Sequence, residues 1–134
     1  MSRERKGQWL SFAAGAFALC YLVIQPAYGH HSFTAEFVAD KTATLNGKIT
    51  QVWFKNPHVR YLIEIENEAG EAETWDARGS PVVWLARKGW TKDTIKEGDE
   101  VSMYGYLGRD GIKMLSIMTV TLADGTLLTD KAPE

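Results

Sequence analysis

Residues 58–66 read HVRYLIEIE, a stretch in which apolar and polar side chains alternate. Because successive side chains of a strand point to opposite faces, this period of two predicts a strand with one buried face. The apolar parity holds Val59, Tyr61, Ile63 and Ile65, and the mainly polar one holds His58, Arg60, Leu62, Glu64 and Glu66. The turn residues 67–70 follow, so residues 71–77 are expected to return as the next strand.

The same period and the positions of turn residues predict the remaining elements. A strand is expected before this pair, and Gly47 within it suggests a bulge or bend. After the pair, Ser80-Pro81 is expected to open a helix and Lys88-Gly89 to close it. The expected strands are 42–54, 58–66, 71–77, 99–107 and 113–122, with a short extension at 126–129. Three strands, a helix and two strands predict a mainly β fold, a five-stranded OB-fold-like barrel with one helix between strands 3 and 4.

The N-terminal segment has the three parts of a secretory signal peptide. Residues 1–8 carry three basic side chains and one acidic one, residues 9–24 carry no charge, and Ala27 and Gly29 are small residues at a cleavage site. We therefore predict a signal peptide over 1–29, cut between Gly29 and His30. The mature chain is then expected to be periplasmic or secreted and to meet a membrane only during export.

An uncleaved membrane anchor is the alternative for this segment, but its 16 apolar residues fall short of the ~20 that span a bilayer. The only cysteine, Cys20, would be removed with the signal peptide, so the mature chain would have no thiol. From His30 onward the chain is expected to form an arm (30–41), one barrel domain (42–129) and a flexible tail (130–134). It carries 12 basic and 16 acidic side chains there, with no basic stripe, which argues against nucleic acid as a partner.

The three histidines of the chain are the candidate metal ligands. Cleavage before His30 would place a free amine, the imidazole of His30 and the imidazole of His31 at the mature N-terminus, and His58 follows the Asn56-Pro57 turn. Three nitrogen ligands from this set suit Cu(II). Zinc is less favoured because it would need a fourth ligand, such as Glu36 or Asp76. The alternative is that the histidines bind no metal and that Phe33 and Phe37 dock the arm.

Two further groups of residues are candidate binding residues. In OB-folds, ligands usually bind beside the loops that join strands 1–2 and 4–5. Here those loops hold Asn56, Pro57 and His58, and Arg109 and Asp110. The side chains of Trp75, Trp90, Tyr104 and Tyr106 are candidates for an aromatic ligand-binding face, with packing in the core as the alternative.

No catalytic motif accompanies these residues, so an enzyme is the less favoured class. The favoured function is an exported binding module that binds Cu(II) or a related ion through His30, His31 and His58, as a carrier, sensor or accessory. The alternative is a metal-free OB-fold interaction module for an exported protein or a small molecule. A copper oxygenase with an N-terminal histidine brace is a third class.

Several motifs in order give the chain a resemblance to a known family. They are residues 30–37 (HHSFTAEF), 56–58 (NPH), 79–81 (GSP), 87–90 (RKGW), 98–101 (GDEV) and 120–125 (VTLADG). In these segments the chain resembles a family of small exported bacterial proteins of unknown function. The resemblance implies export and a single barrel-like domain, and it implies no catalytic residues. The family's double-histidine start and Asn-Pro-His turn correspond to His30, His31 and His58.

Overall fold

The computed structural model describes residues 33–131. The expected signal peptide, His30 and His31 lie outside the described residues. The described residues belong to one compact unit. Its six strands are β1 (Phe37–Trp53), β2 (Arg60–Glu66), β3 (Ala72–Arg78), β4 (Glu100–Gly108), β5 (Met114–Leu122) and β6 (Leu127–Thr129). Two short helices, α3 (Val82–Arg87) and a 3-10 turn (Arg109–Gly111), accompany them, and residues 33–36 form a helical turn.

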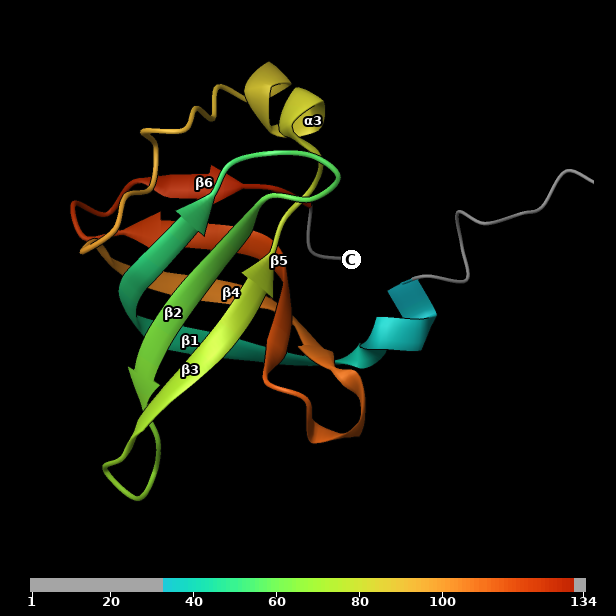
Figure 1. Cartoon of the computed structure of the whole chain (residues 1–134), viewed down its shortest axis with the longest axis vertical. Helices are drawn as coiled ribbons and strands as arrows, with labels where there is room; N and C mark the ends of the chain where they lie inside the picture. Colours follow the sequence, from blue (N-terminus) through green and yellow to red (C-terminus); the bar gives the residue numbers. More distant parts are fainter. Residues whose placement is uncertain (1–32, 132–134) are drawn as a thin grey trace, which may run out of the picture. The chain divides into compact units, whose positions relative to one another are not determined.

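The strands form one sheet that closes in a ring (Figure 1). Their order is β3-β2-β1-β4-β5-β6, with antiparallel pairing between these neighbours. The ring closes because Asp76–Arg78 of β3 pairs in parallel with Met114–Ser116 of β5. The short strand β6 pairs with β5 and is the last strand in the sheet order. The predicted mainly β fold is confirmed.

Strand β1 pairs with two neighbours in turn, which bends the sheet into the ring. Gly47 pairs with Val101 of β4 and also with Ile65 of β2, at the point where β1 passes from one partner to the other. A Cβ atom at Gly47 would lie 2.1 Å from the carbonyl oxygen of Glu64, so only glycine permits this approach. The register shift of the β1–β2 pair lies between Ile49 and Gln51, slightly after the position the sequence suggested.

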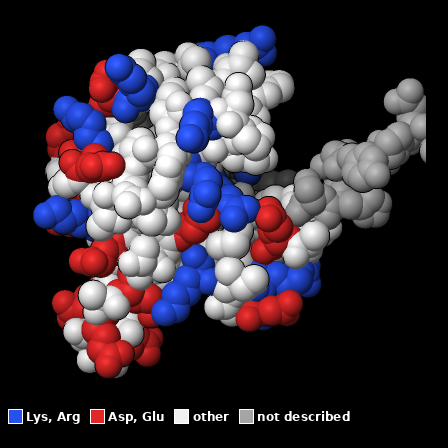
Figure 2. Space-filling model, in the orientation of Figure 1, with Lys and Arg blue, Asp and Glu red and all other residues white. Residues whose placement is uncertain are grey.

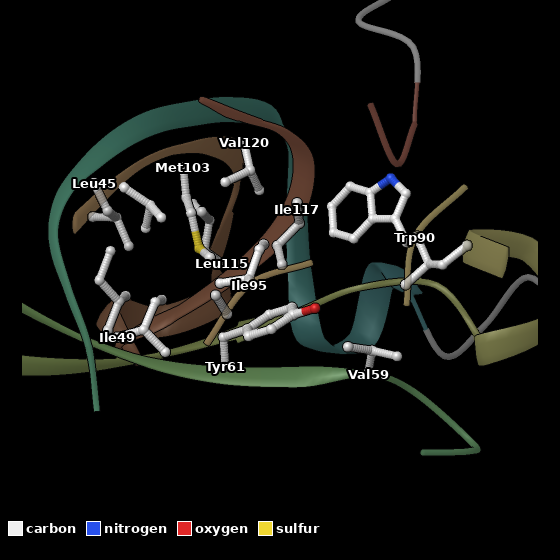
Figure 3. Packing of buried hydrophobic residues seen from close by; sticks show 14 residues of the cluster. Leu45, Ile49, Val59, Tyr61, Trp90, Ile95, Met103, Leu115, Ile117 and Val120 are labelled. Carbon is white, nitrogen blue, oxygen red and sulfur yellow. The ribbon is translucent and has the colours of Figure 1, made fainter. Parts of the chain in front are cut away.

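The interior of the ring is filled by the apolar parity of each strand (Figure 3). Tyr61 and Ile63 of β2, Met103 of β4 and Ile117 of β5 are completely buried. Leu85 of α3 and the connection residues Trp90 and Ile95 complete the core cluster. The alternation of residues 58–66 therefore predicts the buried face correctly, since burial of apolar surface is the main favourable term in folding.

Most strand bounds differ from the prediction by one or two residues, and larger differences lie at both ends of the described chain. β1 begins at Phe37, five residues before Thr42, so part of the expected arm is strand. The N-cap of α3 is Pro81 and not Ser80, and the backbone N–H of Ser80 donates to the carboxylate of Asp130. Asp130, expected in a flexible tail, is buried. Within residues 33–131, no helix is long and apolar enough to cross a membrane.

Candidate functional site

His58 lies in the turn between β1 and β2, with its side chain exposed to solvent. Its Nδ1 atom is 3.1 Å from the carbonyl oxygen of Gly79. A carbonyl can only accept a hydrogen bond, so Nδ1 carries the proton of the neutral ring and Nε2 keeps its lone pair. Histidine ligands in metal sites have this arrangement, in which one ring nitrogen is fixed by a carbonyl and the other is available to the metal.

Another residue of this turn, Asn56, contacts α3. The side-chain oxygen of Asn56 accepts a hydrogen bond of 3.0 Å from the backbone N–H of Val82, the first residue of α3. The N-terminal N–H groups of a helix lack partners inside the helix, so an outside acceptor stabilises its start. Pro57 is exposed and follows a cis peptide bond. Asn56 therefore joins the turn to α3.

The segment Arg78–Ser80 connects three separate parts of the molecule. The guanidinium of Arg78 lies 3.0 Å from the carboxylate of Glu36, next to the start of β1. The carbonyl of Gly79 accepts from His58, and the N–H of Ser80 donates to the Asp130 carboxylate at 2.8 Å. The backbone beside His58 is thus held by the start and the end of the described chain.

Asp130 is a buried polar residue that no sequence pattern indicated. This residue is 2% exposed, and besides the Ser80 bond its carbonyl oxygen accepts a hydrogen bond from the ammonium of Lys88. Within residues 33–131, its Oδ1 atom and the hydroxyl of Tyr61 have no hydrogen-bond partner. Burial, followed by the nearby charge of Asp130, raises the pKa of the Tyr61 phenol well above its ordinary value of 10.0.

The predicted binding loop at Arg109 holds the N-terminal arm. The guanidinium of Arg109 donates to the carbonyl oxygen of Thr34 at 2.9 and 2.6 Å, and to that of Phe37 at 3.3 Å. Asp110 is exposed, with a positive φ of 57° that forms the tight turn. Arg109 therefore has a structural partner within its own chain.

Aromatic packing fixes the same arm. The ring of Phe33 stacks on Phe37 at 5.4 Å between centroids and meets the edge of Tyr106 at 5.5 Å. The ammonium of Lys131 lies 5.7 Å from the centre of the Phe33 ring. Phe33 and Phe37 thus dock the arm in the way that the metal-free alternative expected.

The four aromatic residues proposed for a ligand face do not share one exposed surface. Trp90 is 3% exposed and belongs to the core cluster, so its assignment to such a face is wrong. Trp75 packs against the core from β3, with its indole N–H donated to Glu73 at 2.7 Å. Tyr104 and Tyr106 lie half-buried on the outer parity of β4, where the Tyr104 hydroxyl donates to Thr42 at 3.2 Å.

The carboxylates considered as zinc ligands are engaged by arginines. Asp76 forms a bidentate pair with Arg60 at 3.1 and 2.8 Å and also lies 3.1 Å from Arg78, while Glu36 pairs with Arg78. Among residues 33–131, no group of three or more His, Cys, Asp or Glu side chains could hold a metal ion. His58 is therefore the single candidate nitrogen ligand in this part of the chain, and His30 and His31 lie outside it.

Comparison with known proteins gives a family without an assigned activity. No curated protein matches the chain, and no solved structure matches it. The model of a family of unknown function (DUF6152) matches residues 19–115, and the chain therefore belongs to that family.

Proposed function

We propose that this chain is an exported binding module that binds a transition metal ion, Cu(II) first. His58 would supply one ligand through Nε2. The amine and imidazole of His30 or the imidazole of His31 would supply the others after cleavage at Gly29. The main support for this proposal is the 3.1 Å contact between His58 Nδ1 and the Gly79 carbonyl, which leaves Nε2 free to bind a metal.

The chemistry of the nearby carboxylates favours copper over zinc. Glu36 and Asp76 would each have to leave an arginine partner to become a fourth ligand. Breaking an ion pair that is partly shielded from solvent leaves an uncompensated charge, which opposes that exchange. A site of three nitrogen ligands satisfies Cu(II) without a carboxylate.

We also propose that the ring is an OB-fold. That fold is a five-stranded, partly open Greek-key barrel. Two features support the proposal: β1 pairs with both β2 and β4, and β3 and β5 close the ring in parallel with α3 between β3 and β4. In this fold His58 belongs to a loop that commonly contacts ligands.

A pair of chains tests the metal proposal. One chain begins at His30 and the other has one extra glycine before His30, and both are titrated with Cu(II) by calorimetry and electron paramagnetic resonance. We expect tight binding with nitrogen ligands in the first chain and a large loss of affinity in the second, since the extra residue displaces the amine from the imidazole of His30. Equal or absent binding in the two chains would refute an N-terminal amine ligand.

The variant His58→Ala tests the ligand from the folded unit. We expect it to bind Cu(II) at least about tenfold more weakly if the ring is a ligand. Lys41→Ala is the matched control, because Lys41 is exposed on β1 and is not one of the proposed ligands. If His58→Ala binds Cu(II) as the parent chain does, the metal site is confined to the N-terminus.

A further inference from the structure

Helix α3 exposes two large apolar side chains. Val83 is 50% exposed and Trp84 is 56% exposed, whereas Leu85 beside them is completely buried in the core. The helix lies at the outer end of the ring, as Figure 1 shows. Exposed apolar side chains gain no stabilisation from contact with water. A binding partner that covers Val83 and Trp84 would therefore be favourable.

The two chain segments that meet at α3 are rich in basic side chains, and the acidic residues next to them are Asp130, which is buried, and Asp93, which follows Lys92. The turn residues 53–60 and the segment 78–92 contain six Lys or Arg residues and no Asp or Glu, although the mature chain as a whole is acidic. The two segments are in contact through the bond from Val82 to Asn56 and through the backbone bonds between Val59 and residues 79–80. Five acidic residues lie in residues 64–73 of the β2–β3 hairpin, at the opposite end in Figure 2, and four more lie in residues 93–100.

Two of these cations are exposed and lie on the segments that meet at α3. The guanidinium of Arg87 lies 5.5 Å from the centre of the Trp84 ring. Lys55 precedes Asn56, whose side chain binds the first residue of α3. Within residues 33–131, neither of the two forms an ion pair. We define the α3 face as Lys55, Val83, Trp84 and Arg87.

We propose that the α3 face binds the surface of an anionic lipid bilayer. Tryptophan favours the membrane–water interface because its ring is apolar and its N–H is polar. Each lysine or arginine near an anionic surface adds electrostatic attraction. Arg87 can keep its charge among headgroups while its stem and the Trp84 ring cover apolar surface.

The size of the face favours lipid over a protein partner. A stable protein interface buries about 800 Å² on each partner, far more than two partly exposed apolar side chains provide. Peripheral binding to a bilayer needs only a small inserted apolar group combined with cations. The proposal departs from the expectation that the chain meets a membrane only during export, and it does not depend on metal binding at His58.

Vesicle sedimentation tests the proposal. The chain from His30 onward contains all of residues 33–131, which belong to one compact unit, and lacks the apolar segment 9–24, which would itself bind lipid. It is mixed with vesicles of phosphatidylglycerol and phosphatidylcholine in equal parts, and with vesicles of phosphatidylcholine alone. We expect sedimentation with the anionic vesicles only, weakened by added salt because salt screens exposed charges.

Single substitutions connect the binding to this face. We expect Trp84→Ala to lower the vesicle partition coefficient about tenfold. Lys55→Gln and Arg87→Gln should each lower it about fivefold. Leu127→Ala and Lys41→Gln are the matched controls, since Leu127 is 63% exposed on β6 and Lys41 is exposed on β1, and neither should change binding.

Three outcomes would overturn the proposal. The first is an absence of sedimentation with the anionic vesicles, and the second is equal binding by Trp84→Ala and the parent chain. The third is a concentration-dependent dimer in analytical ultracentrifugation that Trp84→Ala abolishes, without vesicle binding, because it would assign the face to a second copy of this chain. None of these results would bear on the Cu(II) titrations, so the two proposals fail separately.

Discussion

The imidazole of His58, just before β2, is held by the carbonyl of Gly79, just after β3, with 3.1 Å between Nδ1 and the oxygen. The next residue, Ser80, is held by the carboxylate of Asp130 at 2.8 Å. Arg78, on the other side of Gly79, is paired with Glu36. The orientation of the exposed imidazole therefore depends on contacts between residues far apart in the sequence.

The hydrogen bond to Gly79 predicts one tautomer of the neutral His58 imidazole. Since the Gly79 carbonyl accepts a hydrogen bond, we expect the neutral ring to be protonated at Nδ1 and unprotonated at Nε2. Long-range proton–nitrogen NMR spectra of the metal-free protein, recorded above pH 8, distinguish the two tautomers. The same spectrum in concentrated urea is the control, because unfolding breaks the bond to Gly79. A folded protein with its proton on Nε2 would contradict this assignment.

Removing the Asp130 carboxylate should destabilise the fold. Asp130→Ala leaves the partly buried N–H of Ser80 without its acceptor, and we expect the free energy of unfolding to fall by about 1–3 kcal/mol. Asp130→Asn keeps an acceptor oxygen and should lose less. Urea unfolding followed by circular dichroism measures both. Asp124→Ala is the control, since Asp124 is exposed and binds only the N–H of Thr126 in its own turn; an equal loss there would remove the special role of Asp130.

The alternation of apolar and polar residues predicted the strands because it reflects which side chains face the core. Tyr61 and Ile63 are buried on the parity that the sequence assigned to the core. The burial of Asp130 has no such local signal. It directly follows the short strand β6 near the C-terminus, and its partner Ser80 lies 50 residues away. The same holds for Arg109, whose partner Thr34 lies 75 residues away.

For a related reason, only some residues of the candidate site could be predicted from the sequence. Turn residues and loop position single out His58, because the turn lies between two strands that are recognisable from local sequence. The sequence left Trp90 open between a ligand face and the core, because it lies in a connection without a period, where the direction of an aromatic side chain has no local signal. The structure shows that the connection returns over the ring and that Trp90 packs in the core beside Leu85 and Ile95.

Arg109 should hold the N-terminal arm in place. In Arg109→Ala the carbonyl oxygens of Thr34 and Phe37 lose their guanidinium donor, so we expect faster amide hydrogen exchange over residues 33–37. The loss of stability should be about 1–2 kcal/mol. Lys113→Ala is the control from the same loop, because Lys113 is 54% exposed and pairs only with Glu73 at 3.4 Å. Unchanged exchange over 33–37 in Arg109→Ala would show that aromatic packing alone holds the arm.

Above pH 10, the Tyr61 phenol should make stability depend on pH. Burial and the charge of Asp130 raise its pKa in the folded protein, whereas in the unfolded chain it ionises near its ordinary value of 10.0. Above that value the folded state therefore binds more protons than the unfolded state, and its stability falls as pH rises. Below about pH 9 the phenol is protonated in both states and contributes no pH dependence.

The variant Tyr61→Phe isolates this contribution. The hydroxyl of Tyr61 has no hydrogen-bond partner among residues 33–131, so we expect phenylalanine to fill the same space with little loss of stability at pH 7. Lys131, whose pKa burial lowers, is present in both proteins and acts in the opposite direction, so its effect cancels in the comparison. Urea unfolding from pH 7 to pH 11 should give a difference between the two proteins that is constant to about pH 9. Above pH 10 the difference should change in favour of Tyr61→Phe by up to about 1.4 kcal/mol per pH unit. Parallel curves over the whole range would mean that the Tyr61 phenol ionises equally in the folded and unfolded states.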